Sequence, residues 1–328
     1  MAEYRVALVG ATGAVGQEML KVLESRRFPV RDLVPLASSR SRDKRVRFHG
    51  EEVPVQVLDK NAFKGIELAL FSAGASISRE MAPLAVQAGA VVVDNSSAFR
   101  MDPEIPLVVP EVNPQALKDH RGIIANPNCS TIIMVVAITP LHRLSPIQRI
   151  VASTYQAASG AGAKAMDVLR RELSGEKVEQ SVFPHRLAQN LIPRIDVLLE
   201  NGYTKEEMKM VHETRKIMGL PAIPISATCV RVPVERAHSE SVQVTTERPL
   251  RLEEVRDALR GAPGVTLLDE AREDRYPTPL FVSGKDDVHV GRVRIHPSEP
   301  NTYDLWIVGD QIRKGAALNA VQIAELIF

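Results

Sequence analysis

The sequence of 328 residues is poor in cysteine, in net charge and in long hydrophobic segments. Its two cysteines, Cys129 and Cys229, cannot supply a disulfide framework, and such usage is typical of a reducing compartment. A formal net charge of +1 gives no electrostatic footprint for nucleic acid. No apolar run reaches the ~18 residues of a membrane-spanning helix. A strand is expected to begin near Arg5, which leaves no room for a signal peptide. We therefore expect a cytoplasmic protein with neither nucleic acid nor a membrane as partner.

A metal centre is not expected either. The eight histidines are scattered, and His212-Glu213 is not followed by a second histidine at helical spacing. The sequence shows no internal repeats and no low-complexity segment. With 45% hydrophobic and 25% charged residues, the composition is that of a globular protein, and the length suits two domains.

The first half of the chain alternates strands and helices. A strand over 4–9 is followed directly by the turn Gly10-Ala11-Thr12-Gly13-Ala14-Val15-Gly16 and then by a helix over 17–23. Glycines in such a turn let backbone N–H groups approach a pyrophosphate at the helix N-terminus. The spacing differs from the common G-x-G-x-x-G because Thr12 fills the middle position. A tight turn without a ligand therefore stays an alternative.

The end of the second strand, expected over 33–37, indicates which dinucleotide would bind. NAD-specific folds carry an Asp or Glu at this place, whereas this chain has Ser38-Ser39-Arg40-Ser41-Arg42. Hydroxyls and a guanidinium suit a 2′-phosphate, so NADP is favoured. The basic residues over 42–47 are interpreted as a solvated loop. Further strands are expected over 68–71 and 91–94, with a helix over 79–88 between them, and Arg100 beyond them is a candidate anion ligand.

The segment Asn126-Pro127-Asn128-Cys129-Ser130-Thr131 lies between two apolar runs, which predicts a strand over 123–125, a tight turn and a helix. Cys129 would stand where the helix begins. The N–H groups and the positive dipole end of a helix favour an anion, and hence a thiolate over a thiol. Cys129 is therefore a candidate nucleophile. A small buried apolar residue is the alternative.

Beyond Cys129 the strands become longer and their side chains alternate in polarity. Strands are expected over 150–155, 223–234, 241–246, 288–295 and 303–308, with 223–234 and 241–246 as an antiparallel pair. Helices are expected over 164–173, 204–218, 252–259 and 314–328. The last helix has an apolar face that we expect to pack on the first domain.

Several polar residues of this half are candidates for a site. Thr204 and Glu207 form a capping box for the helix over 204–218, on which Glu206 and Lys209 share a face. A plain surface ion pair is the alternative for the last two. Arg231 and Cys229 share a face of their strand, and His238 lies in the connection that follows.

Taken together, these motifs resemble the bacterial aspartate-β-semialdehyde dehydrogenases. The matching stretches run in family order over nearly the whole chain: 10–16, 126–131, 153–162, 206–209, 227–232, 238–240 and 314–317. The resemblance implies an α/β fold with a Rossmann-like NADP-binding domain over 1–128, completed by a C-terminal helix over 313–328 that returns to it. It also implies an α+β catalytic and dimerisation domain over 129–312, and a homodimer.

The implied reaction is the NADPH-dependent reductive dephosphorylation of L-aspartyl 4-phosphate to L-aspartate 4-semialdehyde and phosphate, a step of aspartate-family amino-acid biosynthesis. Cys129 would form a thioester with the acyl group. His238 would act as the acid and base, because its ordinary pKa of ~6.5 allows proton exchange near neutral pH.

The resemblance also assigns binding residues. Gln156, Arg231 and Glu206 match substrate-binding positions, with Arg231 on the α-carboxylate and Glu206 facing the α-ammonium group. Arg100 and Lys209 match phosphate-binding positions. The implied NADP contacts are Gly10, Thr12, Gly13, Ala14, Val15, Arg40, Ser41, Ser159, Gly160 and Gln311. At the last of these the family leads us to expect asparagine, and Cys229 is interpreted as a core residue.

Two alternatives remain open. A related phosphorylating dehydrogenase, such as N-acetylglutamyl-phosphate reductase or glyceraldehyde-3-phosphate dehydrogenase, would use the same thioester chemistry. A catalytically silent NADP-binding homologue is the other. The pair of Glu206 and Arg231 favours a free amino acid as substrate, since an acetylated amine would leave Glu206 without a charged partner.

Overall fold

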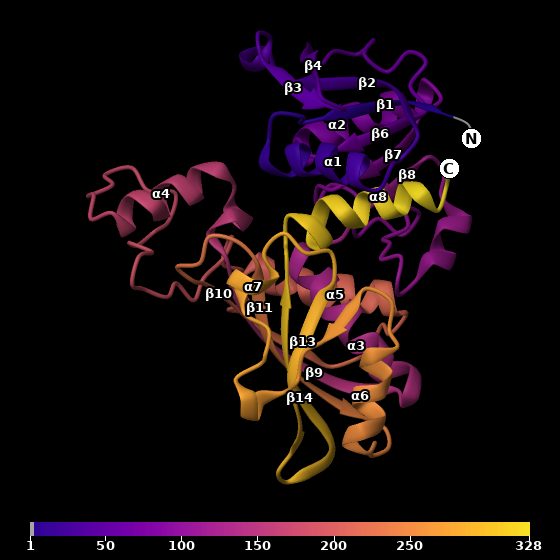
Figure 1. Cartoon of the computed structure of the whole chain (residues 1–328). Coiled ribbons are helices and arrows are strands. Elements are labelled where there is room, and N and C mark those ends of the chain that lie inside the picture. The colour runs from indigo at the N-terminus through magenta and orange to yellow at the C-terminus, as the bar shows by residue number, and fades with distance from the viewer. Residues whose placement is uncertain (1–2) are drawn as a thin grey trace. The chain divides into compact units, whose positions relative to one another are not determined.

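The computed structural model describes residues 3–328, and these form two compact units (Figure 1). The first unit contains the described residues up to Asn128 together with Ala316–Phe328, and the second contains Cys129–Gly315. Each unit is built on a six-stranded sheet. None of the helices in the described part of the chain is long and apolar enough to cross a membrane.

The sheet of the first unit is entirely parallel, in the order β5-β2-β1-β6-β7-β8. Its strands are β1 (Tyr4–Val9), β2 (Val30–Ala37), β5 (Gln56–Val57), β6 (Leu68–Phe71), β7 (Val91–Asp94) and β8 (Ile123–Ala125). Successive side chains of β1 point to opposite faces, so Val6 and Leu8 join one hydrophobic cluster while Ala7 and Val9 join the other. The sheet is therefore covered on both faces, as a parallel sheet must be.

Helices supply the other half of each cluster. Helices α1 (Ala14–Ser25) and α8 (Leu318–Glu325) contribute to the cluster of Val6, whereas α2 (Ala75–Gln87) contributes to the cluster of Ala7. The expected Rossmann-like domain, and the return of the C-terminal helix to it, are thus confirmed. The tail is not one α-helix over 314–328, however, because a π-helical turn (Arg313–Ala317) precedes α8.

Two details of the first unit differ from expectation. The basic stretch over 42–47 is not wholly a loop, since β3 (Arg45–Phe48) pairs with β4 (Glu51–Pro54) in a hairpin that buries Val46 and Phe48. The apolar face expected for the tail does not extend to Leu326, because α8 ends before it and its side chain is 53% exposed. Short 3₁₀ turns occur at Ser39–Ser41 and Pro114–Asp119.

The sheet of the second unit is mixed, in the order β10-β9-β11-β14-β13-β12. Its strands are β9 (Ile147–Gln156), β10 (Ile225–Arg231), β11 (His238–Thr246), β12 (Val265–Leu267), β13 (Val288–His296) and β14 (Glu299–Gly309). The expected direct pairing of 223–234 with 241–246 is wrong, because β9 lies between β10 and β11. The connection between these two strands is long enough to step over one strand, so their opposite directions alone do not make them neighbours.

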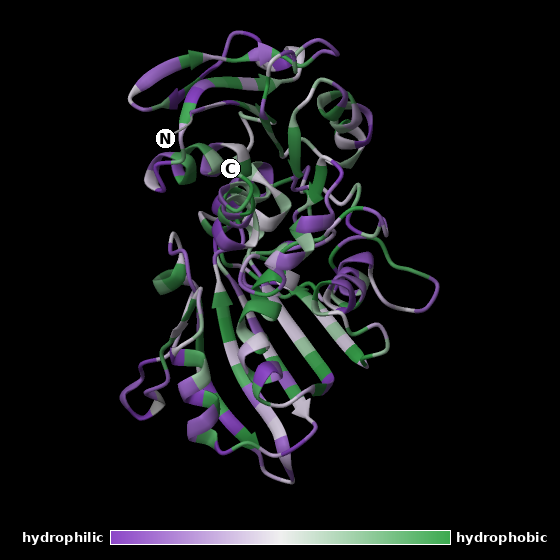
Figure 2. Cartoon of the chain, turned by 90° about the vertical axis from the view of Figure 1, so that its right-hand side faces the viewer, coloured by the Kyte–Doolittle hydropathy of each residue, from purple (hydrophilic) through white to green (hydrophobic). Residues whose placement is uncertain are grey.

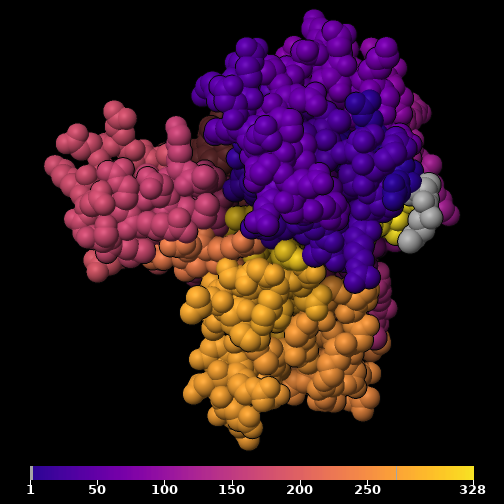
Figure 3. All heavy atoms as spheres, turned by 45° about the horizontal axis from the view of Figure 1, so that its top comes forward, coloured from indigo at the N-terminus to yellow at the C-terminus, as the bar shows by residue number. Residues whose placement is uncertain are grey.

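Helices α3 (Cys129–Leu144), α5 (Lys205–Met218) and α6 (Leu252–Arg260) pack on one face of this sheet (Figure 1). Figure 2 shows the strands alternating between hydrophobic and polar residues, as a sheet covered on one face should. The unit also contains α4 (Ala163–Leu173), α7 (Pro279–Val282) and 3₁₀ turns at Ala158–Ala161 and Ala271–Glu273. The segment that carries α4 projects from the rest of its unit as a lobe, drawn in pink in Figure 3.

Candidate active site

The predicted strand, turn and helix around Cys129 are confirmed: β8 ends at Ala125 and α3 begins at Cys129. Most of α3 is buried, which explains why its sequence is apolar on all sides. Gly315 lies against the first residue of this helix, since a Cβ atom placed on it would stand 2.9 Å from the Cβ of Cys129. Only glycine leaves the cysteine side chain undisturbed at this point.

His238 is the partner of Cys129. Its Nε2 lies 3.6 Å from the Sγ of Cys129, and the ring is completely buried. The backbone N–H of Ala157 donates to Nδ1 at 3.0 Å, which selects the neutral tautomer with its proton on Nε2, facing the sulfur. Burial, with a further contribution from the positive charge of Arg231, lowers the pKa of His238 well below its usual value. The imidazole is therefore neutral at pH 7.

Arg231 and Gln156 lie next to each other at the ends of β10 and β9. The guanidinium is buried and donates from Nη1 to the carbonyl of Ala157 at 2.6 Å. Burial lowers the pKa of Arg231, although nearby Cys129 and Glu206 oppose this. The Gln156 amide donates to a carboxylate oxygen of Glu206 at 3.3 Å. Strand ends and a helix thus bring a cation, an amide and a carboxylate together.

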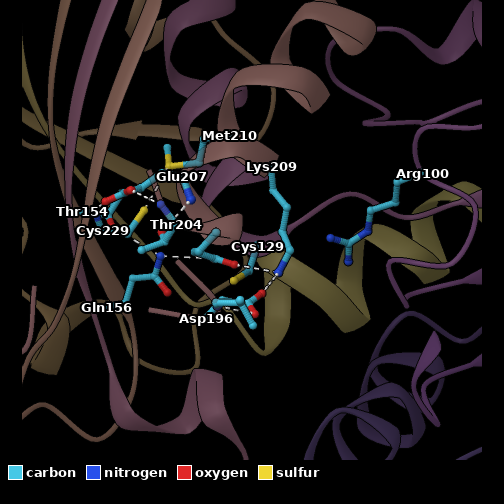
Figure 4. Close-up of polar contacts among 12 residues, drawn as sticks. Arg100, Cys129, Thr154, Gln156, Asp196, Thr204, Glu207, Lys209, Met210 and Cys229 are labelled. Carbon is cyan, nitrogen blue, oxygen red and sulfur yellow. Dashed lines mark hydrogen bonds and ion pairs between the residues drawn. The ribbon is translucent and has the colours of Figure 1, made fainter. Parts of the chain in front are cut away.

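Helix α5 carries the next pair of charges. Its predicted capping box is present, with Thr204 as N-cap and Glu207 as its reciprocal partner. This fixes the first turn, on which Glu206 is buried. The Nζ of Lys209 lies 3.0 Å from Glu206 and 2.8 Å from Asp196 (Figure 4). Burial opposes the charge on Lys209, but the two carboxylates outweigh it and raise the pKa of Lys209 overall.

The three cofactor candidates of the second unit also meet. Gln311 accepts from the N–H of Ala237 at 2.9 Å and donates to the hydroxyl of Ser159. Gly160 follows Ser159 in the 3₁₀ turn Ala158–Ala161 and packs against Arg231 and His238. A Cβ atom on Gly160 would lie 3.0 Å from Nη1 of Arg231 and 3.2 Å from Nε2 of His238. The Gln311 amide, one methylene further from the backbone than that of asparagine, thus bridges the N–H of Ala237 and the hydroxyl of Ser159.

The remaining cofactor candidates lie in the first unit, around the N-terminus of α1. Gly13 is exposed there and forms the N-cap, with no side-chain cap and no acidic residue in the first turn. The hydroxyls of Thr12 and Ser41 lie 3.4 Å apart, which joins the glycine turn to the end of β2, and Arg40 is exposed beside them. Gly10 belongs to the same turn, and Ala14 and Val15 are the first two residues of α1.

Arg100 is also a residue of the first unit. It is buried, and its guanidinium donates to the carbonyls of Asn126 and Asn95 at 2.9 and 3.0 Å. Asn126 in turn donates to Asn95 and to the carbonyl of Ala316. The asparagines around the Cys129 turn therefore have a structural use, and the Arg100 side chain is held in one orientation.

Two acidic residues of the second unit, one beside Lys209 and one two positions after His238, have no role that the sequence predicts. Asp196 lies in an irregular segment, where nothing local links it to Lys209. Glu240 follows His238 by two positions on β11, and both its carboxyl oxygens are buried with no hydrogen-bond partner among the described residues. Burial raises the pKa of Glu240 well above its usual range, which favours the uncharged carboxyl. Cys229, expected in the core, is fully buried.

The comparisons with known proteins agree with this geometry. Residues 5–120 match the family model "Semialdehyde dehydrogenase, NAD binding domain", and residues 138–314 match "Semialdehyde dehydrogenase, dimerisation domain". The chain is 55% identical over 327 residues to the aspartate-semialdehyde dehydrogenase of Synechocystis sp., which covers 98% of this chain and 97% of that one. It is 54% identical over 332 residues to the Aquifex aeolicus enzyme of the same name, with coverages of 99% and 98%. The structure of aspartate semialdehyde dehydrogenase II from Vibrio cholerae complexed with ASA matches with a TM-score of 0.95 and 49% identity, over 100% of this chain and 98% of that chain.

Proposed function

This chain belongs to the aspartate-semialdehyde dehydrogenase family, and from that membership and its own site we infer that it reduces L-aspartyl 4-phosphate to L-aspartate 4-semialdehyde with NADPH, releasing phosphate. The observation that carries the inference is the contact of Cys129 with His238, 3.6 Å apart, with Arg231 and Gln156 beside them. A nucleophile, a proton donor and ligands for an amino acid thus occur in one unit.

We propose that Cys129 starts the reaction as a thiolate. Its sulfur attacks the acyl carbon, the bond from that carbon to the phosphate oxygen breaks, and phosphate leaves the acyl group as a thioester on Cys129. The position of Cys129 at the first residue of α3 supports the thiolate form, because the helix dipole favours a negative charge there. Backbone N–H groups of the same helix start would stabilise the oxyanion that develops. Bound NADPH supplies the hydride that reduces this thioester.

His238 would manage the proton. Its Nε2–H faces the sulfur, so as the acid it would share this proton, through a hydrogen bond, with the oxyanion formed on reduction. The same N–H would hydrogen-bond to the sulfur when the carbon–sulfur bond breaks, which frees the aldehyde and restores the thiolate. The neutral state of the buried ring supports this role, because a neutral ring with Nδ1 as acceptor keeps its proton on Nε2.

The charges of the substrate account for the remaining residues. We propose that Arg231 binds the α-carboxylate, Glu206 the α-ammonium group, and Gln156 the acyl region. Burial of Arg231 and Glu206 supports this, since a desolvated charge binds an opposite charge more strongly. Arg100 of the first unit and Lys209 of the second are each proposed as ligands of the phosphate group.

The residues of the first unit fit NADP. The start of α1 offers backbone N–H groups with neither a side-chain cap nor an acidic residue, which suits a pyrophosphate. Arg40 and Ser41 at the end of β2 would hold the 2′-phosphate, where an NAD-specific protein would have a carboxylate. We propose the other contacts from Gly10, Thr12, Gly13, Ala14 and Val15, and from Ser159, Gly160 and Gln311 of the second unit. We accordingly propose residues 1–128 with 313–328 as the NADP-binding domain and residues 129–312 as the catalytic and dimerisation domain.

We further propose a homodimer formed through the second unit, which includes the matched dimerisation domain. The face of its sheet away from α3 and α5 is only partly covered: Val151 is 39% exposed, and Tyr155 lies against Trp306 in a tilted arrangement with ring centroids 5.6 Å apart. A second copy would cover this face, and light scattering after chromatography would report twice the chain mass. As a biosynthetic enzyme, the dimer would work in the cytoplasm.

The proposed reaction is tested in reverse. Purified protein is mixed with aspartate semialdehyde, phosphate and NADP, and the appearance of NADPH is followed. We expect phosphate-dependent NADPH formation that is abolished in Cys129→Ala. The chain offers a matched control in Cys229→Ala, which removes its other cysteine, a buried thiol whose pKa is raised by burial, and should stay active. Turnover of N-acetylglutamate semialdehyde but not of aspartate semialdehyde would contradict the substrate, and NADP binding without any turnover would indicate a silent homologue.

A further inference from the structure

The ammonium group of Lys209 is shared between two carboxylates. Nζ lies 2.8 Å from Oδ2 of Asp196 and 3.0 Å from Oε2 of Glu206, and Figure 4 shows the Lys209 side chain directed at Asp196. One positive charge therefore faces two negative charges. A phosphate group brought to Lys209 would be repelled by these two carboxylates, although phosphate binding is the role proposed above for this lysine.

Substrate binding would give only one of these two carboxylates a new positively charged partner. Under the proposed function, Glu206 acquires the α-ammonium group of the substrate as its partner. Asp196 acquires no positive charge from the substrate and would stand beside the incoming phosphate. Two like charges at such distances repel each other, so one of them must withdraw.

Asp196 is the carboxylate that is free to withdraw. Its side chain is 30% exposed, whereas that of Glu206 is 7% exposed on the first turn of α5. Besides Lys209, its carboxylate accepts from the N–H of the next residue, Val197, at 2.8 Å, and is attracted by the charge of the exposed Lys205. Its φ of +69° puts it in the left-handed region, which an aspartate tolerates. Among the described residues, no buried partner therefore holds the carboxylate against Lys209.

The segment around Asp196, residues 193–197, is anchored at both ends to the site. Ile192 exchanges two backbone hydrogen bonds with Arg231. Leu198 lies opposite Thr204, the N-cap of α5, in a bridge whose hydrogen bonds join Val197 to Lys205 and Leu199 to Tyr203. This arc borders a cavity of about 520 Å³ that is also lined by Arg231. The Asp196 side chain can thus turn away while the backbone remains fixed to the two elements that carry Arg231 and Lys209.

We propose that the Asp196 carboxylate forms an ion pair with Lys209 before the substrate binds, and that the phosphate group of the substrate displaces it. This inference rests on the proposed function, because Lys209 must be the phosphate ligand. Asp196 is then a specificity-determining residue: it weakens the binding of phosphate without touching the reacting atoms.

The test is the variant Asp196→Asn. Asparagine keeps the oxygen that accepts from Val197 and tolerates the left-handed backbone, so it removes the charge and little else. In the reverse assay at constant ionic strength, we expect the KM for phosphate to fall by about fivefold, as for loss of a competing, partly exposed ion pair. The KM values for aspartate semialdehyde and NADP, and kcat, should stay within about twofold, because a displaced competitor affects only the ligand it competes with.

A matched control is Asp269→Asn. Asp269 also pairs with a basic side chain, Arg256 at 3.0 Å, and also accepts from a backbone N–H, that of Val293. It has no part in the proposed site, so its KM for phosphate should equal that of the wild type. An unchanged or higher KM for phosphate in folded Asp196→Asn would overturn the inference, because it would make Asp196 a support that holds Lys209 in place.

Direct binding separates this inference from the proposed function. Inorganic phosphate is titrated by calorimetry into Cys129→Ala and into Cys129→Ala/Asp196→Asn. Tighter binding in the double variant supports the displacement of Asp196, and equal or weaker binding overturns it. If the wild type shows no phosphate-dependent turnover, the proposed function fails, while the calorimetric comparison still decides the role of Asp196.

Discussion

The Sγ of Cys129 and the Nε2 of His238 lie 3.6 Å apart, although 109 positions separate the two residues in the chain. One stands at the start of α3 and the other at the start of β11. Their contact depends on how α3 packs on the second sheet. Changes that move either element by an ångström should therefore affect the reaction more than they affect the fold.

The first prediction concerns the pH dependence of His238. Burial and the charge of Arg231 lower its pKa well below 6.5, so the folded ring stays neutral at a pH where an exposed histidine is protonated. The acid limb of kcat/KM should therefore lie well below pH 6.5. An NMR titration of the imidazole resonances, with His238→Asn to assign the signal, checks this. A titration of His238 at or above pH 6.5 would contradict it.

The same shift affects stability with a definite sign. The unfolded imidazole takes up a proton as the pH falls through about 6.5, whereas the folded one does not. The contribution of His238 to the free energy of unfolding is therefore present above this pH and is lost as the pH falls toward the lower folded pKa. Urea unfolding of the wild type and of His238→Asn at two pH values measures it.

The second prediction concerns Gly160→Ala. The new Cβ would lie 3.0 Å from Nη1 of Arg231 and 3.1 Å from Cε1 of His238, so both side chains must shift. We expect kcat/KM to fall by at least about tenfold, because small misplacements of reacting groups are costly. The control is Gly261→Ala, where the Cβ would meet only an ordinary contact of 3.5 Å. Equal kinetics for the two variants would argue against this packing.

The third prediction concerns the buried carboxyl of Glu240. Its pKa is raised by burial, so its stabilising effect is present below the unfolded pKa and is lost as the pH rises toward the folded pKa. In Glu240→Gln this dependence is absent. The stability of the wild type relative to the variant should thus decline by on the order of 1 kcal/mol per pH unit above pH ~4.5.

Urea unfolding at pH 5, 6 and 7 tests this, with Glu200→Gln as a control for an exposed carboxyl. A wild type that gains stability over Glu240→Gln as the pH rises would mean that Glu240 is ionised and paired in the folded protein. The variant should keep its KM for aspartate semialdehyde, since Glu240 has no proposed contact with substrate.

The fourth prediction concerns Gln311→Asn, which introduces the residue that the family resemblance led us to expect. The Gln311 amide spans from the N–H of Ala237 to the hydroxyl of Ser159, and a side chain one methylene shorter cannot reach both. Loss of one buried hydrogen bond should cost about 1 kcal/mol of unfolding free energy. The Gln311 amide holds Ala237 in a left-handed conformation, with a φ of +71°, directly before His238. Loss of this contact should misplace His238, so kcat should fall as well.

Unfolding and kinetics of Gln311→Asn are compared with those of Gln148→Asn, an exposed position on β9. If Gln311→Asn is as stable and as active as the wild type, the bridge is not needed to position His238.

The local features of this protein were predictable from its sequence. The glycine turn after β1, the start of α3 at Cys129 and the capping box of α5 each depend on residues a few positions apart. Hydrophobic periodicity and capping chemistry act over this range, so sequence patterns report them directly. The family resemblance added roles for residues such as Arg231 and His238 that composition and spacing leave open.

The tertiary structure alone decided which distant residues meet. Strand order is set by non-local pairing, so no local pattern reveals that β9 lies between β10 and β11. For the same reason Asp196, in an irregular segment, gives no sign in the sequence that it contacts Lys209. The burial of Glu240 and the pKa of His238 likewise depend on which elements cover them, because desolvation is a property of the packed protein.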